Sequence, residues 1–590
     1  MLPDTPLPYR GAFASPEEYI ESLLAFASTR DIFQILCGGV HILDFFTTEP
    51  GLFYAAIPRE WHPFLLSCDI MQLLNLLMRD DLDKLDFAQG QGPPESLLQY
   101  VRSIRDLSLR RDFSAAKETL PVLPRSVAVG MKPKKIHEVT HFADYIERLC
   151  CDISGSCGRD ISHLVDFGSG QNYLGRALAS APYNRRVVAV EGRENNVAAA
   201  RQLDRLSGLT VKAKVKRNKK LWNQILGILG PDKESDPESL AEAVKQVAGA
   251  EAFDFRPADQ LESEHELNGD KGHVQYVSGR LDSGDLADVL TEVQRKGAEG
   301  EQKPSSQFMA ISIHSCGNLS HHGIRSLVLN PEIRAVAIVG CCYNRMTEKL
   351  GPPTYKHACL RPTLRALNGR GIDESDKHDA QGFPMSKRFS TYQGEGIRLN
   401  ITARMMACQA PENWTRQDSD DFFTRHFFRA VLQRIFLDRG VVGCVRHRQS
   451  GSEAASGPFD VSTNPVILGS LGKHCYGSLR AYVRGAVEKL TTSTECKQYA
   501  EVMGTKMAGM TDEEIDGYEE AYRPRKRELS VVWSLMAFSA TLVESLIVAD
   551  RWTYLVEHGH VVKEAWVETV FDYRQSPRNL VVVGVKRDDA

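Results

Sequence analysis

The chain has 590 residues, of which 42% are hydrophobic and 25% charged, as in soluble globular proteins with more than one folding unit. A formal net charge of −4 gives no global electrostatic reason to bind nucleic acid, so only a local basic patch could do so. The start, MLPDTPLPYRG, has neither a basic nor an apolar segment, so we expect no secretory signal and a cytoplasmic or nuclear protein. The 13 cysteines contain no Cys-x-x-Cys pair and are expected to be reduced thiols.

Two patterns divide the first part of the chain. Residues 1–130 contain helical patterns such as SPEEYIESLLAFAST and no alternating strands, which predicts a helical N-terminal domain. From residue 131 helices alternate with apolar runs, the pattern of a parallel α/β sheet. We expect strands at residues 163–167, 186–190, 274–277, 308–313 and 335–339.

The second part of the chain predicts two insertions and a return to the sheet. Residues 231–270 hold 12 acidic against 3 basic side chains, which indicates a flexible acidic insertion. Residues 347–523 are expected to form a mostly helical insertion. A helix at 528–557 follows, whose uncharged apolar run is too short for a bilayer, so we expect a buried helix and no membrane contact. Its two late carboxylates, Glu544 and Asp550, are expected to face solvent or to be paired, because unpaired buried charges are costly.

The last 65 residues or so also fit an α/β pattern. The apolar runs 565–571 and 579–585 could close the same sheet. The α/β domain is then discontinuous and comprises residues 131–346 and 524–590.

The stretch VDFGSGQNYLGRAL follows the first predicted strand and opens into a predicted helix. Gly168 and Gly170 give the Gly-x-Gly of a tight turn, where a backbone without Cβ atoms bends and lets a ligand approach. A dinucleotide fold needs a third glycine at position 173, where this chain has Tyr173, and no P-loop motif occurs. We therefore expect this turn, with Asp166, to bind a ligand that lacks a pyrophosphate.

Glu191 stands at the end of the second predicted strand, 21 residues beyond Gly170. A carboxylate at this place can accept hydrogen bonds from both hydroxyls of a ribose. The turn and the acid together indicate a ligand that contains adenosine. S-adenosyl-L-methionine contains adenosine and a carboxylate suited to a helix N-terminus, and it has no pyrophosphate, so we expect it to be the cofactor.

Two further strand ends carry unusual polar residues, in the sequences AISIHSCGNLS and VAIVGCCYNRM. Ligands of open α/β sheets bind beyond the carboxyl ends of the strands, so we expect both clusters to line the site. We assign His314, Tyr343 and Asn344 as the catalytic or substrate-orienting groups of a methyl-transfer site, and Cys342 to the substrate pocket.

The same two clusters contain side chains of the types that bind zinc: His314, Cys316, Cys341 and Cys342. Their spacing does not match a zinc ribbon or finger. Adjacent cysteines at a strand end usually place one thiol in the core and the other in the cleft. We therefore expect no metal site.

A run of motifs in the same order resembles the methyltransferase-like protein 25 family, from about Lys132 to the C-terminus. The motifs are DFGSGQNYLGRAL, IHSCGNLS, GCCYNRMTE, QGFPMS, ARMMACQ, RAVLQ, ESLIVADRW and SPRN. The resemblance implies a Rossmann-like class I methyltransferase domain that uses S-adenosyl-L-methionine. It adds two residues to the expected cofactor site: Asp282, which stands in for the acid after the third strand, and Ser315.

The substrate is indicated by two weaker features. The pairing of a His-x-Cys-Gly strand with a Cys-Cys-Tyr strand also looks like tRNA 2′-O-methyltransferases of the acceptor stem, which suggests RNA. The run VKAKVKRNKK at residues 211–220 is either a solvated surface segment or a patch that contacts phosphates. In the second case the RNA-binding residues are Lys216, Arg217, Lys219 and Lys220. A protein substrate, or a catalytically silent adenosyl-binding scaffold, stays open, and the sequence does not indicate an oligomeric state.

Overall fold

The structure is a computed structural model. Its residues form two compact units, each held together by its own internal contacts. Unit 1 comprises Met1–Glu118, Arg148–Ile161 and Leu281–Ala590, and unit 2 comprises Thr119–Glu147 and Ser162–Arg280. The domain boundaries expected from the sequence remain predictions. The structure describes residues 3–48, 51–85, 92–114, 120–157, 160–212, 219–229, 237–248, 263–265, 272–279, 281–297, 307–350, 378–446, 461–463 and 465–588.

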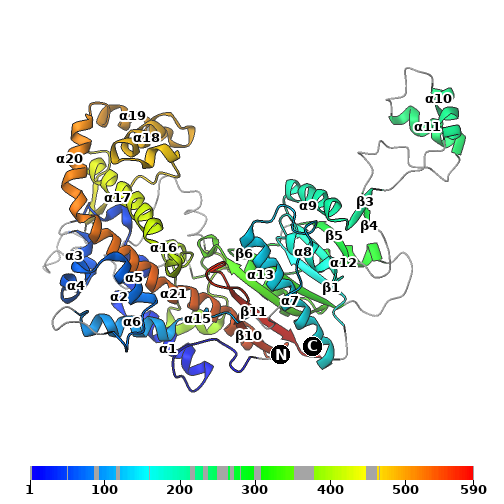
Figure 1. Cartoon of the computed structure of the whole chain (residues 1–590), viewed down its shortest axis with the longest axis horizontal. Coiled ribbons are helices and arrows are strands. Elements are labelled where there is room, and N and C mark those ends of the chain that lie inside the picture. The colour runs from blue at the N-terminus through cyan, green and yellow to red at the C-terminus, as the bar shows by residue number, and fades with distance from the viewer. Residues whose placement is uncertain are drawn as a thin grey trace. The chain divides into compact units, whose positions relative to one another are not determined.

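A mixed sheet of seven strands forms the α/β part of the chain (Figure 1). Its strands are β1 (His163–Phe167), β2 (Arg186–Glu191), β5 (His273–Ser278), β6 (Phe308–Cys316), β7 (Ile333–Cys341), β10 (Val562–Thr569) and β11 (Leu580–Lys586). Their order is β10–β11–β7–β6–β1–β2–β5. The pairs β1–β2, β2–β5 and β6–β7 are parallel, whereas β11 runs antiparallel to both β7 and β10. The predicted α/β fold class and all seven predicted strands are confirmed.

Strands β1, β2, β7 and β11 are largely buried and have continuous apolar sequences, as in sheets covered on both faces, whereas the edge strands β5 and β10 are partly exposed. In β7, IRAVAIVGC is buried at every position. Helices alternate with the strands along the chain: α7 (Pro133–Cys157) precedes β1, and α8 (Tyr173–Ala179), α9 (Glu194–Ser207), α12 (Ala287–Gly297) and α13 (Leu319–Leu329) follow β1, β2, β5 and β6.

The segment expected to be a flexible acidic insertion contains regular structure where it is described. It includes helix α11 (Pro237–Ala248) and strand β4 (Ser263–His265), which pairs with β3 (Thr210–Lys212). α11 packs against α10 (Lys219–Leu229) through a small apolar core of Ile225, Leu229, Ala243, Val244 and Val247. The expected flexible insertion therefore contains a packed helix at residues 237–248, because its net acidic charge hid apolar residues at helical spacing.

Unit 1 is mostly helical outside the sheet. Its described residues before position 115 contain helices and no strand, as predicted: α1 (Pro16–Thr29), α2 (Asp31–Gln34), α3 (Leu52–Ala56), α4 (His62–Ser67), α5 (Ile70–Met78) and α6 (Glu95–Leu107). A second helical block follows β7, with one short hairpin: α15 (Lys387–Thr391), α16 (Ile401–Met406), α17 (Arg416–Asp438), β8 (Cys444–Arg446), β9 (Val461–Thr463), α18 (Leu479–Thr492), α19 (Lys497–Lys506) and α20 (Asp512–Tyr522).

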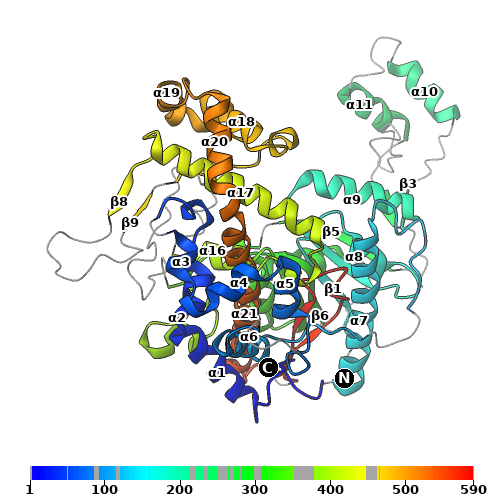
Figure 2. The ribbon, with the colours of Figure 1, turned by 60° about the vertical axis from the view of Figure 1, so that its left-hand side comes forward.

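Helix α21 (Lys526–Glu557) is the core helix of unit 1. It contacts α5, α6, α16 and α17 as well as β10 and β11 (Figure 1), and the four helices are labelled near it in the second view too (Figure 2). One helical stretch of the described chain, Asp512–Glu557, is long and apolar enough to cross a membrane, but 94% of its apolar window is buried inside the protein. A helix that is apolar all round is typical of a protein core, so the predicted buried helix is confirmed.

Glu544 of α21 is buried and lies at the centre of a charged cluster. Its carboxylate accepts a hydrogen bond of 2.7 Å from the Tyr343 hydroxyl and pairs with the guanidinium groups of Arg578, at 2.5 Å, and Arg111. Asp550, further along α21, is also buried. The alternative that these two carboxylates face solvent is wrong, because the core supplies partners for both.

We expect Glu544→Ala to lower the free energy of unfolding by about 3–5 kcal/mol, because it leaves two largely buried guanidinium groups without their shared carboxylate. The measurement is the urea midpoint followed by circular dichroism. Glu519→Ala is the control, since Glu519 pairs with the exposed Arg523 on a helix surface and its loss should cost less than about 1 kcal/mol. Equal midpoints for the two variants would contradict the role given to Glu544.

Candidate functional site

The glycine turn after β1 has the backbone conformation that its sequence predicts. Gly168 and Gly170 have φ values of +61° and +58°, in the left-handed region that favours glycine. A Cβ atom added at Gly170 would meet only the Gly168 carbonyl oxygen, at 4.0 Å. The turn is therefore open at Gly170, and its glycine is required by the backbone rather than by packing.

Glu191, at the end of β2, holds this turn in place. Its carboxylate accepts hydrogen bonds from the backbone N–H of Gly170 and of Arg193, both at 2.9 Å and one to each oxygen. The side chain is only 8% exposed. Each carboxylate oxygen accepts more than one hydrogen bond, so Glu191 keeps acceptor capacity for a ligand while it fixes the loop.

Ser169, between the two glycines, has a buried hydroxyl oxygen that has no hydrogen-bond partner. A buried polar group without a partner costs about 1–3 kcal/mol, so such a group at a turn of this type indicates a place where a ligand or water binds. Ser169 is not among the residues predicted from the sequence. Its position between Gly168 and Gly170 was the signal that could have found it.

Asp166 is buried on β1, two residues before Gly168. Burial raises the pKa of its carboxyl to about 8, Lys135 acts in the opposite direction, and Glu191 adds to the increase. Lys135 also pairs with the fully buried Glu138 at 2.7 Å. Unit 2 thus brings the predicted residues Asp166, Gly170 and Glu191 together, and it adds two residues of α7 that were not predicted.

A buried polar network supports the start of α8 after the turn. Asn172 donates a hydrogen bond of 3.0 Å to the hydroxyl of Tyr276 on β5, which donates in turn to Asp204 on α9. Arg176 of α8 pairs with the same carboxylate at 2.9 Å, and both members of this pair are buried. The network joins two helices and a strand of unit 2 and keeps the turn in one conformation.

Close packing of α8 on β2 depends on Gly175. An added Cβ there would lie 3.0 Å from Val187 Cγ1 and would overlap Asn172. The packing role expected of a glycine at position 173 is thus performed two residues later. Gly175 was not predicted, because the dinucleotide motif places its third glycine at position 173.

The other predicted binding residues lie elsewhere. Asp282 is exposed and Ser315 is buried on β6, both in unit 1, and the Ser315 hydroxyl has no hydrogen-bond partner. Lys216 and Arg217 lie outside the described residues. Lys219 and Lys220 begin α10 in unit 2. The substrate role of these basic residues stays a prediction.

The ends of β6 and β7 in unit 1 have unusual backbone conformations. His314 and Cys342 have φ values of +64° and +43°, which residues other than glycine rarely adopt. The pairing of β6 with β7 shifts between Ser312 and Ser315, so His314 sits in a bulge. Gly317 follows with φ +57°, and a Cβ there would overlap the backbone of Arg345. These contacts hold the two strand ends against each other.

Tyr343 and Asn344, predicted as catalytic, have different surroundings. Tyr343 is 1% exposed and its hydroxyl donates to Glu544, so it acts inside the core of unit 1 and is not offered to a substrate. The catalytic role predicted for Tyr343 is corrected to a structural one. Asn344 is partly exposed and accepts a hydrogen bond of 3.6 Å from the Cys408 thiol.

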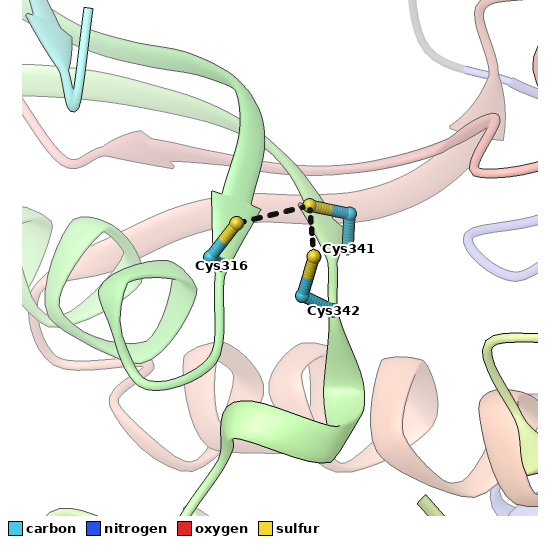
Figure 3. A group of neighbouring side chains, drawn as sticks. All are labelled: Cys316, Cys341 and Cys342. Carbon is cyan, nitrogen blue, oxygen red and sulfur yellow. Dashed lines mark hydrogen bonds between the residues drawn. The ribbon is translucent and has the colours of Figure 1, made fainter. Parts of the chain in front are cut away.

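Three thiols gather at these strand ends. Cys316 and Cys341 have their sulfur atoms 3.5 Å apart, and those of Cys341 and Cys342 are 3.6 Å apart (Figure 3). Cys341 is buried and Cys342 is partly exposed, as expected of adjacent cysteines at a strand end, but Cys342 turns its side chain back toward Cys341.

The sequence of this α/β region is similar to those of known proteins. Residues 134–349 match the family model of a methyltransferase domain. The chain contains a methyltransferase domain. It is 24% identical over 514 residues to mouse (Mus musculus) "Probable methyltransferase-like protein 25", across 78% of this chain and 75% of that protein. The human (Homo sapiens) protein of the same description is 22% identical over 520 residues, with the same coverage. No solved structure matches the chain significantly.

The resemblance to methyltransferase-like protein 25 predicted from the motifs is confirmed. The matched methyltransferase domain contains the glycine turn, Glu191 and both strand ends with their cysteines. It ends at residue 349, before the second helical block.

We expect the stability of the protein to fall as pH rises from about 4 to about 8, because Asp166 keeps a proton in the folded state that the unfolded chain loses near its ordinary pKa. The contribution amounts to at most about 1.4 kcal/mol per pH unit. Asp166→Asn should remove this part of the slope in unfolding midpoints measured at several pH values. Glu194→Gln, at an exposed position of unit 2, should keep it. Parallel curves for the wild-type protein and Asp166→Asn would refute the assignment.

Proposed function

We propose that this methyltransferase depends on S-adenosyl-L-methionine and modifies RNA. The observation that supports the cofactor most directly is the bond from the Gly170 N–H to the Glu191 carboxylate. It joins the glycine turn to an acid at the next strand end, the arrangement that binds the ribose of an adenosyl group in nucleotide-binding α/β folds.

The residues of unit 2 fit this cofactor. The backbone is open at Gly170, the Ser169 hydroxyl is buried without a partner, and Glu191 keeps acceptor capacity. We assign the turn and Glu191 to the adenosyl and amino-acid parts, and we keep the buried Asp166 beside them as a cofactor-binding residue. When bound, the cofactor supplies a methyl group on a positively charged sulfur.

In unit 1 we assign the acceptor site to the end of β6, with His314 as its orienting or proton-accepting group. His314 sits in a bulge with a left-handed backbone, and such conformations concentrate at functional sites. Cys342 and Asn344, at the end of β7, were also predicted as site residues, and both are partly exposed. Tyr343 is left out because its hydroxyl is buried.

The RNA substrate is supported by the basic run at residues 211–220, since closely spaced lysines and arginines neutralise phosphates. The partial likeness to tRNA 2′-O-methyltransferases points in the same direction. A protein substrate, or binding of the cofactor without transfer, are the alternative outcomes of the experiments below.

We expect Gly170→Leu to abolish binding of S-adenosyl-L-methionine in calorimetry while circular dichroism stays native. The side chain would fill the open turn and would require a left-handed backbone. Gly227→Leu is the control, because Gly227 is exposed on α10 and an added Cβ there meets nothing within 4 Å. Unchanged affinity in a folded Gly170→Leu protein would remove the cofactor assignment.

We expect tritiated methyl groups to appear in RNA when the protein is incubated with labelled cofactor and RNA and protein fractions from a deletion strain. Lys219→Glu with Lys220→Glu should weaken RNA binding and make the slope of log affinity against log salt shallower, by about 0.7–0.9 for each phosphate that is no longer neutralised. Lys473→Glu with Lys497→Glu, two exposed lysines of unit 1, is the charge-matched control. Label in protein with transfer unaffected by the reversals would exclude RNA, and binding without any transfer would indicate the scaffold.

A further inference from the structure

Three cysteines gather at the ends of β6 and β7 in unit 1. The ligand atoms of Cys316, Cys341 and Cys342 all lie within 4.8 Å of one another (Figure 3). Two of the separations between sulfur atoms are 3.5 Å and 3.6 Å. All three cysteines are free thiols.

The register of the sheet produces this cluster. Cys316 and Cys341 are direct partners in the parallel pair β6–β7, so their side chains leave neighbouring strands at the same level. Cys342 would ordinarily point to the opposite face, because successive residues of a strand alternate. Its left-handed backbone, with φ +43°, ends the strand and brings the third sulfur back to the other two.

We propose that Cys316, Cys341 and Cys342 form a trithiolate site for a zinc-type divalent cation whose fourth coordination position is open. In tetrahedral zinc sites the zinc–sulfur distance is about 2.3 Å, which places neighbouring sulfur atoms about 3.8 Å apart. The two observed separations are within about 0.3 Å of that value. A cation therefore fits after small side-chain adjustments, without movement of the strands.

A positive charge, that of Arg345, acts on the cluster at Cys342. Three thiolates with one divalent cation carry a net charge of −1, which Arg345 can balance. The remaining thiol protons are released to solvent when the metal binds.

Accessibility distinguishes this site from a closed structural one. Cys341 is buried, whereas Cys316 and Cys342 are partly exposed, so solvent can reach the cluster from one side. Sites with three protein ligands and an open side take water or a substrate atom as the fourth ligand. Among the described residues no fourth cysteine, histidine or carboxylate belongs to the group.

The test uses the full-length protein, purified under reducing conditions and loaded with zinc or with cobalt. We expect about one zinc per chain after dialysis, and the visible absorption of tetrahedral cobalt–thiolate coordination in the cobalt-loaded protein. Cys342→Ser and Cys316→Ser should each lower zinc affinity at least about 10-fold in a chelator competition, because a hydroxyl is a much poorer ligand than a thiolate. Both positions are partly exposed, so these variants should fold.

Cys408→Ser is the matched control, since Cys408 is also partly exposed and lies outside the cluster. It should keep the zinc stoichiometry, the affinity and the cobalt spectrum of the wild-type protein. The proposal is overturned if zinc content is equal in the wild-type protein and Cys342→Ser. It is also overturned if the cobalt spectrum lacks thiolate coordination, or if the thiols form a disulfide instead of retaining metal. None of these readouts depends on methyl transfer.

Discussion

Unit 1 depends on how the core helix α21 buries its charged side chains. A helix that is apolar on all sides could rotate or slide among its neighbours at little cost, whereas a buried charge must keep its partners. Glu544 binds Arg111, from the segment after the N-terminal helices, and Arg578, from the turn between β10 and β11. Asp550 accepts hydrogen bonds from the backbone N–H groups of Met385 and Ser386. The charges therefore fix the rotation of α21 and dock three distant segments on it.

The same helix positions the strand ends that carry the predicted acceptor residues. Arg551 is fully buried, donates to the Ser320 hydroxyl at the start of α13, and lies over the ring of Tyr343. Gly340, near the end of β7, leaves room for this guanidinium, which any Cβ atom there would displace. The bulge at His314 is thus one part of a core that its neighbours hold in place, and this is how strained backbone persists in a folded protein.

In unit 2, neutral and charged side chains fix the position of the glycine turn. The Glu191 carboxylate fixes the open glycine turn from one side. The pair of Arg176 and Asp204, extended by Tyr276, fixes the helix that follows it. The protein's own groups hold the turn, so a ligand that binds there loses little free energy in ordering it. The orphan hydroxyl of Ser169 is the one polar side chain of this turn, as far as the chain is described, for which the core supplies no partner.

The sequence by itself determined the order and type of the elements, since apolar runs, glycine positions and helical spacing are local properties. It also determined the glycine turn with Glu191, because both follow strands whose ends must meet at one edge of a sheet. Only the tertiary structure decided which side chains share a partner. The burial of Tyr343 against Glu544 joins residues 201 positions apart, and the convergence of three cysteine sulfurs depends on strand register and on one left-handed residue, Cys342. Neither follows from spacing, because long-range pairing and a reversed backbone dihedral leave no periodic signal in the chain.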